Sequence, residues 1–343
     1  MRGAKSNTRQ GTGQGFVAGG NETAQALWYV GPGRAEIREE RLPPLAPGAV
    51  RVRALHGAVS RGTEALVAAG RVPESEYQRM RAPCMGGAFP FPVKYGYATV
   101  GRVEAGPADL QGRTVFTLHP HQTLFDMPAD AVVPLPDGVP AERAILSANM
   151  ETALNATWDA GPGPYTRIAI VGAGVVGALV GLLYGRMEVP DVTLVDIDAS
   201  RLELAQKFWL RFATPDTARG DCDLVVHTSA SAGGLKTALD LAGDEATVLE
   251  LSWYGAGDVA VPLGGAFHSR RLKLISSQVG KVAPSHRSTY SHRQRLETAI
   301  GLLTDARVDA LIAPAIAFKD LPKRLPKILA PGSGILCQRI DYP

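Results

Sequence analysis

The segment 168–177 limits the possible folds of this chain more than any other part of the sequence. Its residues read Ile-Ala-Ile-Val-Gly-Ala-Gly-Val-Val-Gly, and an apolar stretch with helical spacing follows from residue 178 to residue 184. A β-branched run that enters the pattern G-x-G-x-x-G ahead of a helix is typical of a dinucleotide-binding turn. In such a turn Gly172 allows the tight bend, Gly174 lets the backbone approach a pyrophosphate, and Gly177 lets the helix pack on the sheet.

A second strand supports this interpretation. Residues 192–195 form a short apolar run that ends in Asp196, at about the distance from Gly172 that is expected of a ribose-binding acid. Asp196 can accept both ribose hydroxyls and would repel a 2′-phosphate, so we expect NAD and consider NADP less favoured. Arg201 works against this argument, because it can turn toward a phosphate. The residues predicted to bind the cofactor are Gly172, Gly174, Val175, Val176, Gly177, Asp196, Arg201 and Thr228.

Composition places the chain among globular proteins of balanced charge. Its 343 residues are 45% hydrophobic, which is enough for two domains, and they carry a formal net charge of +3. Arg2, Lys5 and Arg9 account for that charge, so the remainder is neutral and gives no electrostatic indication of nucleic-acid binding. No apolar run is long enough to span a bilayer, and we expect no membrane partner. Residues 1–23 are polar and are expected to form a disordered tail.

The three cysteines, Cys84, Cys222 and Cys337, are far apart in the sequence and form no C-x-x-C pair. We expect three buried thiols rather than a disulfide framework. This usage is typical of the reducing cytoplasm, which is the predicted location.

The pattern of strands and helices predicts an α/β protein with two domains. Residues 24–150 are mostly β, with short alternating runs at 50–55, 98–103 and 114–118. Strands at 168–171, 192–195, 223–227, 246–251 and 272–276 then alternate with helices at 175–186, 200–209 and 233–242. Such alternation predicts a doubly wound parallel sheet. We expect a Rossmann domain over residues 151–280 and a β-rich domain formed by residues 24–150 together with 281–343.

A β-rich domain followed by a late dinucleotide-binding unit resembles the medium-chain dehydrogenase/reductase superfamily, of the zinc alcohol dehydrogenase type. The resemblance covers nearly all of the chain after residue 24 and includes Gly57-Ala58-Val59-Ser60-Arg61-Gly62-Thr63-Glu64 and Leu135-Pro136-Asp137-Gly138. It implies a GroES-like catalytic domain beside the Rossmann domain, a small-molecule substrate, and a homodimer or homotetramer. The segment from Gly57 to Pro73 looks similar to the branch that contains bacteriochlorophyllide 3-hydroxyethyl dehydrogenase.

The sequence departs from the superfamily at both zinc sites. Zinc-binding members have G-I-C-G-T-D and later G-H-E, whose Cys and His bind the catalytic metal. Here the Cys position holds Ser60 or Arg61, depending on the alignment, and the His position holds Tyr97. The four-cysteine lobe that binds structural zinc is absent as well, because no cysteine lies between Cys84 and Cys222. Zn²⁺ prefers thiolate, imidazole and carboxylate ligands, so we expect no zinc.

One alternative metal site stays open. His56, His119 and His121 can converge, together with Glu64 or Glu151. The H-x-H spacing puts two imidazoles on one face of a strand, although Pro120 between them favours an irregular strand end.

Without zinc, a side chain must polarise the carbonyl and exchange a proton with the alkoxide. The alignment places Tyr97 and His119 on the wall that faces the nicotinamide, and these are the candidate acids. Ser60 and Thr63 are candidate hydroxyl relays, and Glu64 is expected to orient Tyr97 or His56. The alternatives are an aromatic core residue for Tyr97, a surface histidine for His119 and a solvated carboxylate for Glu64.

The predicted function is therefore zinc-independent hydride transfer between NAD(H) and a secondary alcohol or ketone. An NADPH-dependent quinone or enoyl reductase is the second interpretation, and a nucleotide-binding relative without turnover is the third. The segment 270–295 contains several arginines and lysines and no acid before Glu297. It favours either an anionic substrate or a solvated, subunit-facing surface.

Overall fold

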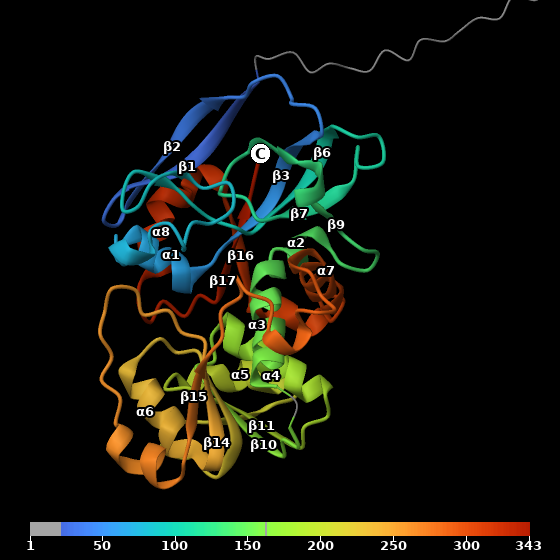
Figure 1. Cartoon of the computed structure of the whole chain (residues 1–343). Helices are drawn as coiled ribbons and strands as arrows, with labels where there is room; N and C mark the ends of the chain where they lie inside the picture. Colours follow the sequence, from blue (N-terminus) through green and yellow to red (C-terminus); the bar gives the residue numbers. More distant parts are fainter. Residues whose placement is uncertain (1–21, 162) are drawn as a thin grey trace, which may run out of the picture.

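The computed structural model describes residues 22–161 and 163–343. Two sheets lie at one end of the molecule and a third, parallel sheet lies at the other (Figure 1). The smaller of the first two has the order β2-β1-β5-β4 and the larger the order β16-β17-β3-β6-β7-β9, with β8 also paired to β3. These strands are β1 (Thr23–Gly31), β2 (Arg34–Arg41), β3 (Ala49–Val59), β4 (Gly86–Gly87), β5 (Val93–Lys94), β6 (Thr99–Ala105), β7 (Thr114–Thr117), β8 (Leu124–Pro128), β9 (Val133–Pro134), β16 (Ile312–Ala317) and β17 (Cys337–Asp341).

The third sheet has six parallel strands in the order β12-β11-β10-β13-β14-β15. Its strands are β10 (Arg167–Val171), β11 (Asp191–Val195), β12 (Arg211–Ala213), β13 (Cys222–His227), β14 (Ala242–Glu250) and β15 (Lys273–Ser276). Counted from β10, this is the order 3-2-1-4-5-6 of dinucleotide-binding sheets. Residues 168–171 of β10 are all buried, as expected of a central strand that helices cover on both faces.

Helices connect the strands of the parallel sheet and link it to the β-rich end. α4 (Val175–Arg186), α5 (Leu202–Lys207) and α6 (Ala232–Leu241) are the crossovers. α2 (Ala141–Ala144) and α3 (Ser147–Ala160) lead from the β-rich end into the sheet, and α3 packs against both α4 and α7 (His292–Leu302). α1 (Arg61–Ala68) and α8 (Leu321–Leu329) lie together at the β-rich end.

The end of the chain returns to the β-rich sheets. β17 pairs antiparallel with β3, with Asp341 opposite His56, and β16 pairs with β17 on its other side. Arg61 strengthens this closure because its guanidinium donates to the carbonyls of Ile328, Ala330 and Ile335 around the end of α8. The C-terminal strand β17 therefore belongs to the same sheet as β3, and Arg61 has a structural role at this junction.

The α/β fold class with a doubly wound sheet is confirmed. The short strand β12 was not predicted. Thr23 lies in β1 and Glu22 pairs with the buried Arg51, so these two residues do not belong to the disordered tail that was expected over residues 1–23. Residues 1–21 lie outside the described part of the chain. The expectation of three buried thiols is wrong for Cys84, which is exposed. Within the described residues no helix is long and apolar enough to cross a bilayer.

Candidate active site

The glycine turn after β10 has the geometry that the sequence predicts. Gly172 has a φ of +108°, which L-residues rarely adopt, and a Cβ there would lie 2.8 Å from the backbone nitrogen of Ser229. A Cβ on Gly177 would lie 2.0 Å from the carbonyl oxygen of Gly172, so only glycine allows α4 to pack so closely. A Cβ on Gly174 would meet nothing within 4 Å. The three glycines therefore supply the bend, the helix contact and an open approach.

The open approach ends at the first turn of α4. Gly174 is the N-cap residue, and its lack of a side chain leaves the first N–H groups of the helix, at Val175 and Val176, without a side-chain acceptor. Helix N-termini of this kind bind phosphate groups. Thr228 lies behind the turn, since its hydroxyl donates to the Gly172 carbonyl over 2.8 Å. Thr228 thus supports the turn, and its contact with a cofactor stays a prediction.

Asp196 follows β11 and lies against the same turn. One carboxylate oxygen accepts from the Ala173 N–H at 2.7 Å and the other from the Asp198 N–H at 2.9 Å. Arg201 is directed elsewhere, 3.4 Å from Asp198 and within reach of the Gly334 carbonyl. The carboxylate of Asp196 is therefore held at the turn. Arg201, the cation that would favour a 2′-phosphate, is paired with Asp198.

A second group of candidate residues lies at the β-rich end. Tyr97 donates a hydrogen bond of 2.6 Å to the Ser60 hydroxyl, at the N-cap of α1. Burial raises the pKa of Tyr97, and hydrogen bonds with Ser60 and Thr63 oppose that rise. The phenol therefore keeps its proton near neutral pH. Tyr97 also packs against two separate hydrophobic clusters, one of which extends into the parallel sheet, so it lies where the two halves of the chain meet.

Glu64 fixes the position of Ser60. Its side chain is fully buried and accepts from the Ser60 N–H at 2.7 Å and from the Tyr29 hydroxyl at 2.6 Å. His121 Nε2 lies 2.9 Å from the same oxygen that Tyr29 contacts. No hydrogen bond joins Glu64 to Tyr97 or to His56 among the described residues, and the carboxylate is linked to Tyr97 by hydrogen bonds only through Ser60.

His119 does not share this arrangement. Its ring is 4% exposed, stacks on Phe125 at 3.7 Å between centroids, and places Nδ1 2.9 Å from the Pro120 carbonyl. Burial lowers the pKa of His119 to about 3, so the imidazole is neutral near pH 7 and has no proton to spare for an alkoxide. Of the two candidate acids, the geometry keeps Tyr97.

The three histidines of the alternative metal site have separate partners. His56 Nδ1 lies 2.8 Å from Asp341, while His121 contacts Glu64 and His119 contacts a carbonyl. Glu151 is paired with Arg295. In the described ranges, no three His, Cys, Asp or Glu side chains are grouped so that they can hold a metal ion.

The basic segment after β14 consists largely of arginines that satisfy internal acceptors. Arg295 is buried and donates to Glu151, Asn155 and two carbonyls. Arg270, Arg287 and Arg293 also donate to backbone carbonyls. Arg287, Arg293 and Arg295 stabilise the chain around α3 and α7, and Arg270 holds the start of β14. They give no support to an anionic substrate.

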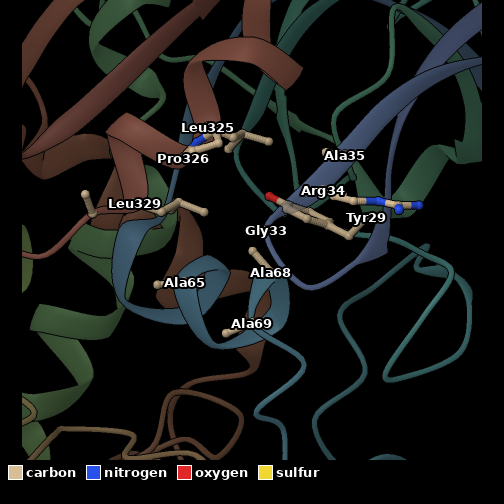
Figure 2. Close-up of a pocket in the computed structure, with 11 residues that line it drawn as sticks. Tyr29, Gly33, Arg34, Ala35, Ala65, Ala68, Ala69, Leu325, Pro326 and Leu329 are labelled. Atoms are coloured by element: carbon tan, nitrogen blue, oxygen red, sulfur yellow. The ribbon is translucent and has the colours of Figure 1, made fainter.

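Two further features were not predicted. His227 and Glu250, the last residues of β13 and β14, form a buried pair that also contacts Ser229. The second feature is an apolar cavity of about 270 Å³ between α1, α8 and the β1–β2 turn, with Tyr29, Ala68 and Leu325 among its lining residues (Figure 2). The sequence signal for the His227 pair is weak, because it depends on which strands are neighbours.

Comparisons with known proteins find similarity to dehydrogenases. No family model matches the chain. L-threonine 3-dehydrogenase from Ruegeria pomeroyi is 32% identical over 124 residues, which are 36% of this chain and 35% of that protein. Sorbitol dehydrogenase from Arabidopsis thaliana is 31% identical over 80 residues, or 23% of this chain and 22% of its own. The match thus spans about a third or less of these relatives.

Solved structures match over almost the whole chain. L-idonate 5-dehydrogenase from Escherichia coli has a TM-score of 0.77 at 13% identity and covers 94% of this chain and 99% of its own. A zinc-binding dehydrogenase from Sinorhizobium meliloti, bound to NADP, has a TM-score of 0.73 at 17% identity, with coverage of 94% and 100%. An alcohol dehydrogenase from Escherichia coli in complex with NADH has a TM-score of 0.74 at 15% identity, with coverage of 93% and 99%.

The fold is therefore that of these dehydrogenases, an α/β fold with β-rich sheets at one end and a six-stranded parallel sheet at the other. These matches concern the fold. They give no support to the narrower resemblance to the bacteriochlorophyllide branch.

The two glycines at the start of α4 provide a matched test of the turn. Gly177→Ala should destabilise the protein by about 2–3 kcal/mol, because the new Cβ collides with the Gly172 carbonyl. Gly174→Ala should change stability by less than about 0.5 kcal/mol, because its surroundings are open and its φ of −77° suits alanine. Thermal unfolding of both variants measures the difference. Equal midpoints would show that the packing of α4 on the turn is described wrongly.

Proposed function

We propose that this protein is an oxidoreductase that transfers a hydride between NAD(H) and a secondary alcohol or ketone, with Tyr97 in place of a catalytic metal. The observation that carries the proposal is the 2.6 Å hydrogen bond from Tyr97 to Ser60. In the alignment with zinc-binding members, Tyr97 stands at the position of the His ligand, and Ser60 or Arg61 stands at that of the Cys ligand. The glycine turn and Asp196 support a dinucleotide, and the dehydrogenases named above support the reaction class.

The residues present fit a nicotinamide dinucleotide, which supplies the hydride when bound. Val175 and Val176 would hold its pyrophosphate at the open start of α4, and Asp196 would accept the hydroxyls of the adenosine ribose. In carbonyl reduction, the Tyr97 hydroxyl would turn from Ser60 and donate its hydrogen bond to the substrate oxygen. Its proton would pass to that oxygen when the bound dinucleotide supplies the hydride. The phenolate would then accept a hydrogen bond from Ser60 until a proton from solvent restores the phenol.

The environment of Tyr97 suits this task. Burial and the neighbouring Glu64 raise the pKa of Tyr97, so the phenol is protonated in the resting state and can stabilise a developing alkoxide. Glu64 holds the N–H of Ser60, and the hydroxyl of Ser60 therefore stays within reach of the phenol. The alternative is an NADPH-dependent quinone or enoyl reductase. Turnover measured on alcohols, ketones, quinones and enones distinguishes the two functions.

We also propose a homodimer or homotetramer. β15 is paired on one side only among the described strands, and its Leu274 and Ile275 are each 37% exposed. An apolar edge strand of this kind is a surface that another chain can cover.

Tyr97→Phe is the direct test of the proton donor. Turnover with NADH and a ketone should fall by roughly 10²–10⁴-fold because the acid is lost, while the affinity for NADH stays nearly unchanged. Tyr95→Phe is the matched control, since it removes the hydroxyl of the neighbouring buried tyrosine and should keep full turnover. Steady-state kinetics on alcohols, ketones, quinones and enones measures both variants. Full turnover in Tyr97→Phe would refute this role.

The choice of cofactor follows from the charges at the end of β11. NADH should bind more tightly than NADPH, because Asp196 is close to the glycine turn and Arg201 is paired with Asp198. Asp196→Asn should reduce the difference in affinity between NADH and NADPH, because it removes the negative charge without changing the size of the side chain. Fluorescence titration with both cofactors gives the dissociation constants. A wild-type protein that prefers NADPH would contradict the assignment.

Metal dependence separates this mechanism from that of zinc-binding members. We expect the purified protein to contain no stoichiometric zinc and to keep its turnover after dialysis against a chelator, because Ser60 and Tyr97 are poor ligands for Zn²⁺. Elemental analysis before and after dialysis measures this. About one tightly held metal ion per chain, lost together with activity, would defeat the proposal.

A further inference from the structure

The buried pair at the ends of β13 and β14 belongs to a longer hydrogen-bond chain. His227 is fully buried, with Nδ1 2.7 Å from Glu250 and Nε2 2.7 Å from the Ser229 hydroxyl. The Ser229 oxygen in turn lies 2.9 Å from the hydroxyl of Ser231, which caps α6 by accepting from the Gly234 N–H. The hydrogen-bond chain therefore leads from the carboxylate of Glu250 to the exposed start of α6.

This chain lies directly beside the glycine turn. The Thr228 N–H donates to the Val171 carbonyl at 2.8 Å, and the backbone nitrogen of Ser229 is close to Gly172. β10 and β13 are the strands on either side of the point where the order of the sheet reverses. Ligands of doubly wound sheets bind in the crevice at that point. Ser229 is partly exposed there, whereas His227 is enclosed behind it.

The loop is built tightly around the Ser229 hydroxyl. A Cβ on Gly234 would lie 2.0 Å from the Ser229 oxygen and 2.8 Å from His227 Nε2. Only glycine at this position therefore allows α6 to pack against the Ser229–His227 hydrogen bond. Ala230, the next residue, has a φ of +51°, which costs free energy for a residue other than glycine. Its N–H is anchored by the Ser252 hydroxyl at 3.0 Å. The strained loop is thus held in one conformation.

Glu250 sets the direction of every hydrogen bond in the chain. Burial alone would raise the pKa of Glu250, but hydrogen bonds from His227 and Ser252 outweigh it, and the pKa lies below its usual range. The carboxylate therefore only accepts, from the Ser252 N–H, the Tyr254 hydroxyl and His227 Nδ1. With its proton on Nδ1, the ring presents Nε2 as an acceptor. Ser229 must then donate its hydroxyl proton to His227.

We propose that Ser229 is a cofactor-positioning residue whose oxygen accepts a hydrogen bond from a neutral donor in the nicotinamide half of the bound dinucleotide. The donor is a ribose hydroxyl or the carboxamide N–H. The Ser229 proton is committed to His227 and one lone pair to Ser231, so one lone pair is left for a ligand. A phosphate oxygen, which only accepts, is disfavoured at this position. This inference rests on the proposed binding of a dinucleotide.

Glu250→Gln reverses the direction of the hydrogen bonds from residue 250 through His227 to Ser229, with little change in the shape of the side chain. The amide oxygen can still accept from Ser252, while the amide N–H₂ donates to His227 Nδ1 and moves the ring proton to Nε2. His227 then donates to one lone pair of Ser229 while Ser231 keeps its bond to the other, so no lone pair is left for a ligand. We expect NADH to bind about three- to tenfold more weakly, the effect of one lost hydrogen bond. Asp240→Asn is the control, because it makes the same chemical change in an exposed ion pair on α6.

Two measurements decide the matter. Nitrogen NMR of the histidine rings should show the Nδ1–H form of His227 in the wild type and the Nε2–H form in Glu250→Gln, and this readout needs no cofactor. Titration with ADP-ribose identifies the donor: a weakened affinity in Glu250→Gln assigns the ribose hydroxyl, and an effect on NADH alone assigns the carboxamide.

The outcomes separate this inference from the proposed function. A wild-type ring with Nε2 protonated, or wild-type affinities for both ligands in Glu250→Gln, would overturn the role of Ser229 even if turnover is found. A wild-type protein that binds no dinucleotide would instead refute the proposed function.

Discussion

The buried carboxylate of Glu64 is the interaction on which the candidate active site depends. It is surrounded by Tyr29, His121 and the N–H of Ser60, and it holds the first residue before α1 in place. Burying a carboxyl group without hydrogen-bond partners costs folding free energy, so the burial of Glu64 depends on these three contacts. Because Ser60 is fixed, its hydroxyl can meet Tyr97 at 2.6 Å. The fold thus holds a phenol and a serine hydroxyl in contact at the site that we propose for catalysis.

A second, partly buried carboxylate has a corresponding role at the other end of the molecule. Glu250 orients His227, which orients Ser229 beside the glycine turn. In both cases an acid that contacts no ligand determines how a serine is presented. The first serine faces the proposed proton donor, and the second faces the proposed cofactor. Preorganised polar groups of this kind need little rearrangement when a ligand arrives.

Local patterns in the sequence were enough to predict the glycine turn and the alternating strands. They failed where partners are distant in sequence. Arg295 looked like a ligand for anions because its acceptor Glu151 lies 144 residues away. The pair of His227 and Glu250 exists only because β13 and β14 are neighbours in register, which no periodicity shows. The low pKa of His119 follows from burial that the sequence does not reveal.

A crystal structure with cofactor and a bound ketone, recorded at the zinc absorption edge, tests the central claim most directly. The account predicts the ketone oxygen within about 2.6–3.2 Å of the Tyr97 hydroxyl and no anomalous peak near Ser60. A metal ion between the ketone and the protein, or a ketone that does not contact Tyr97, would contradict it.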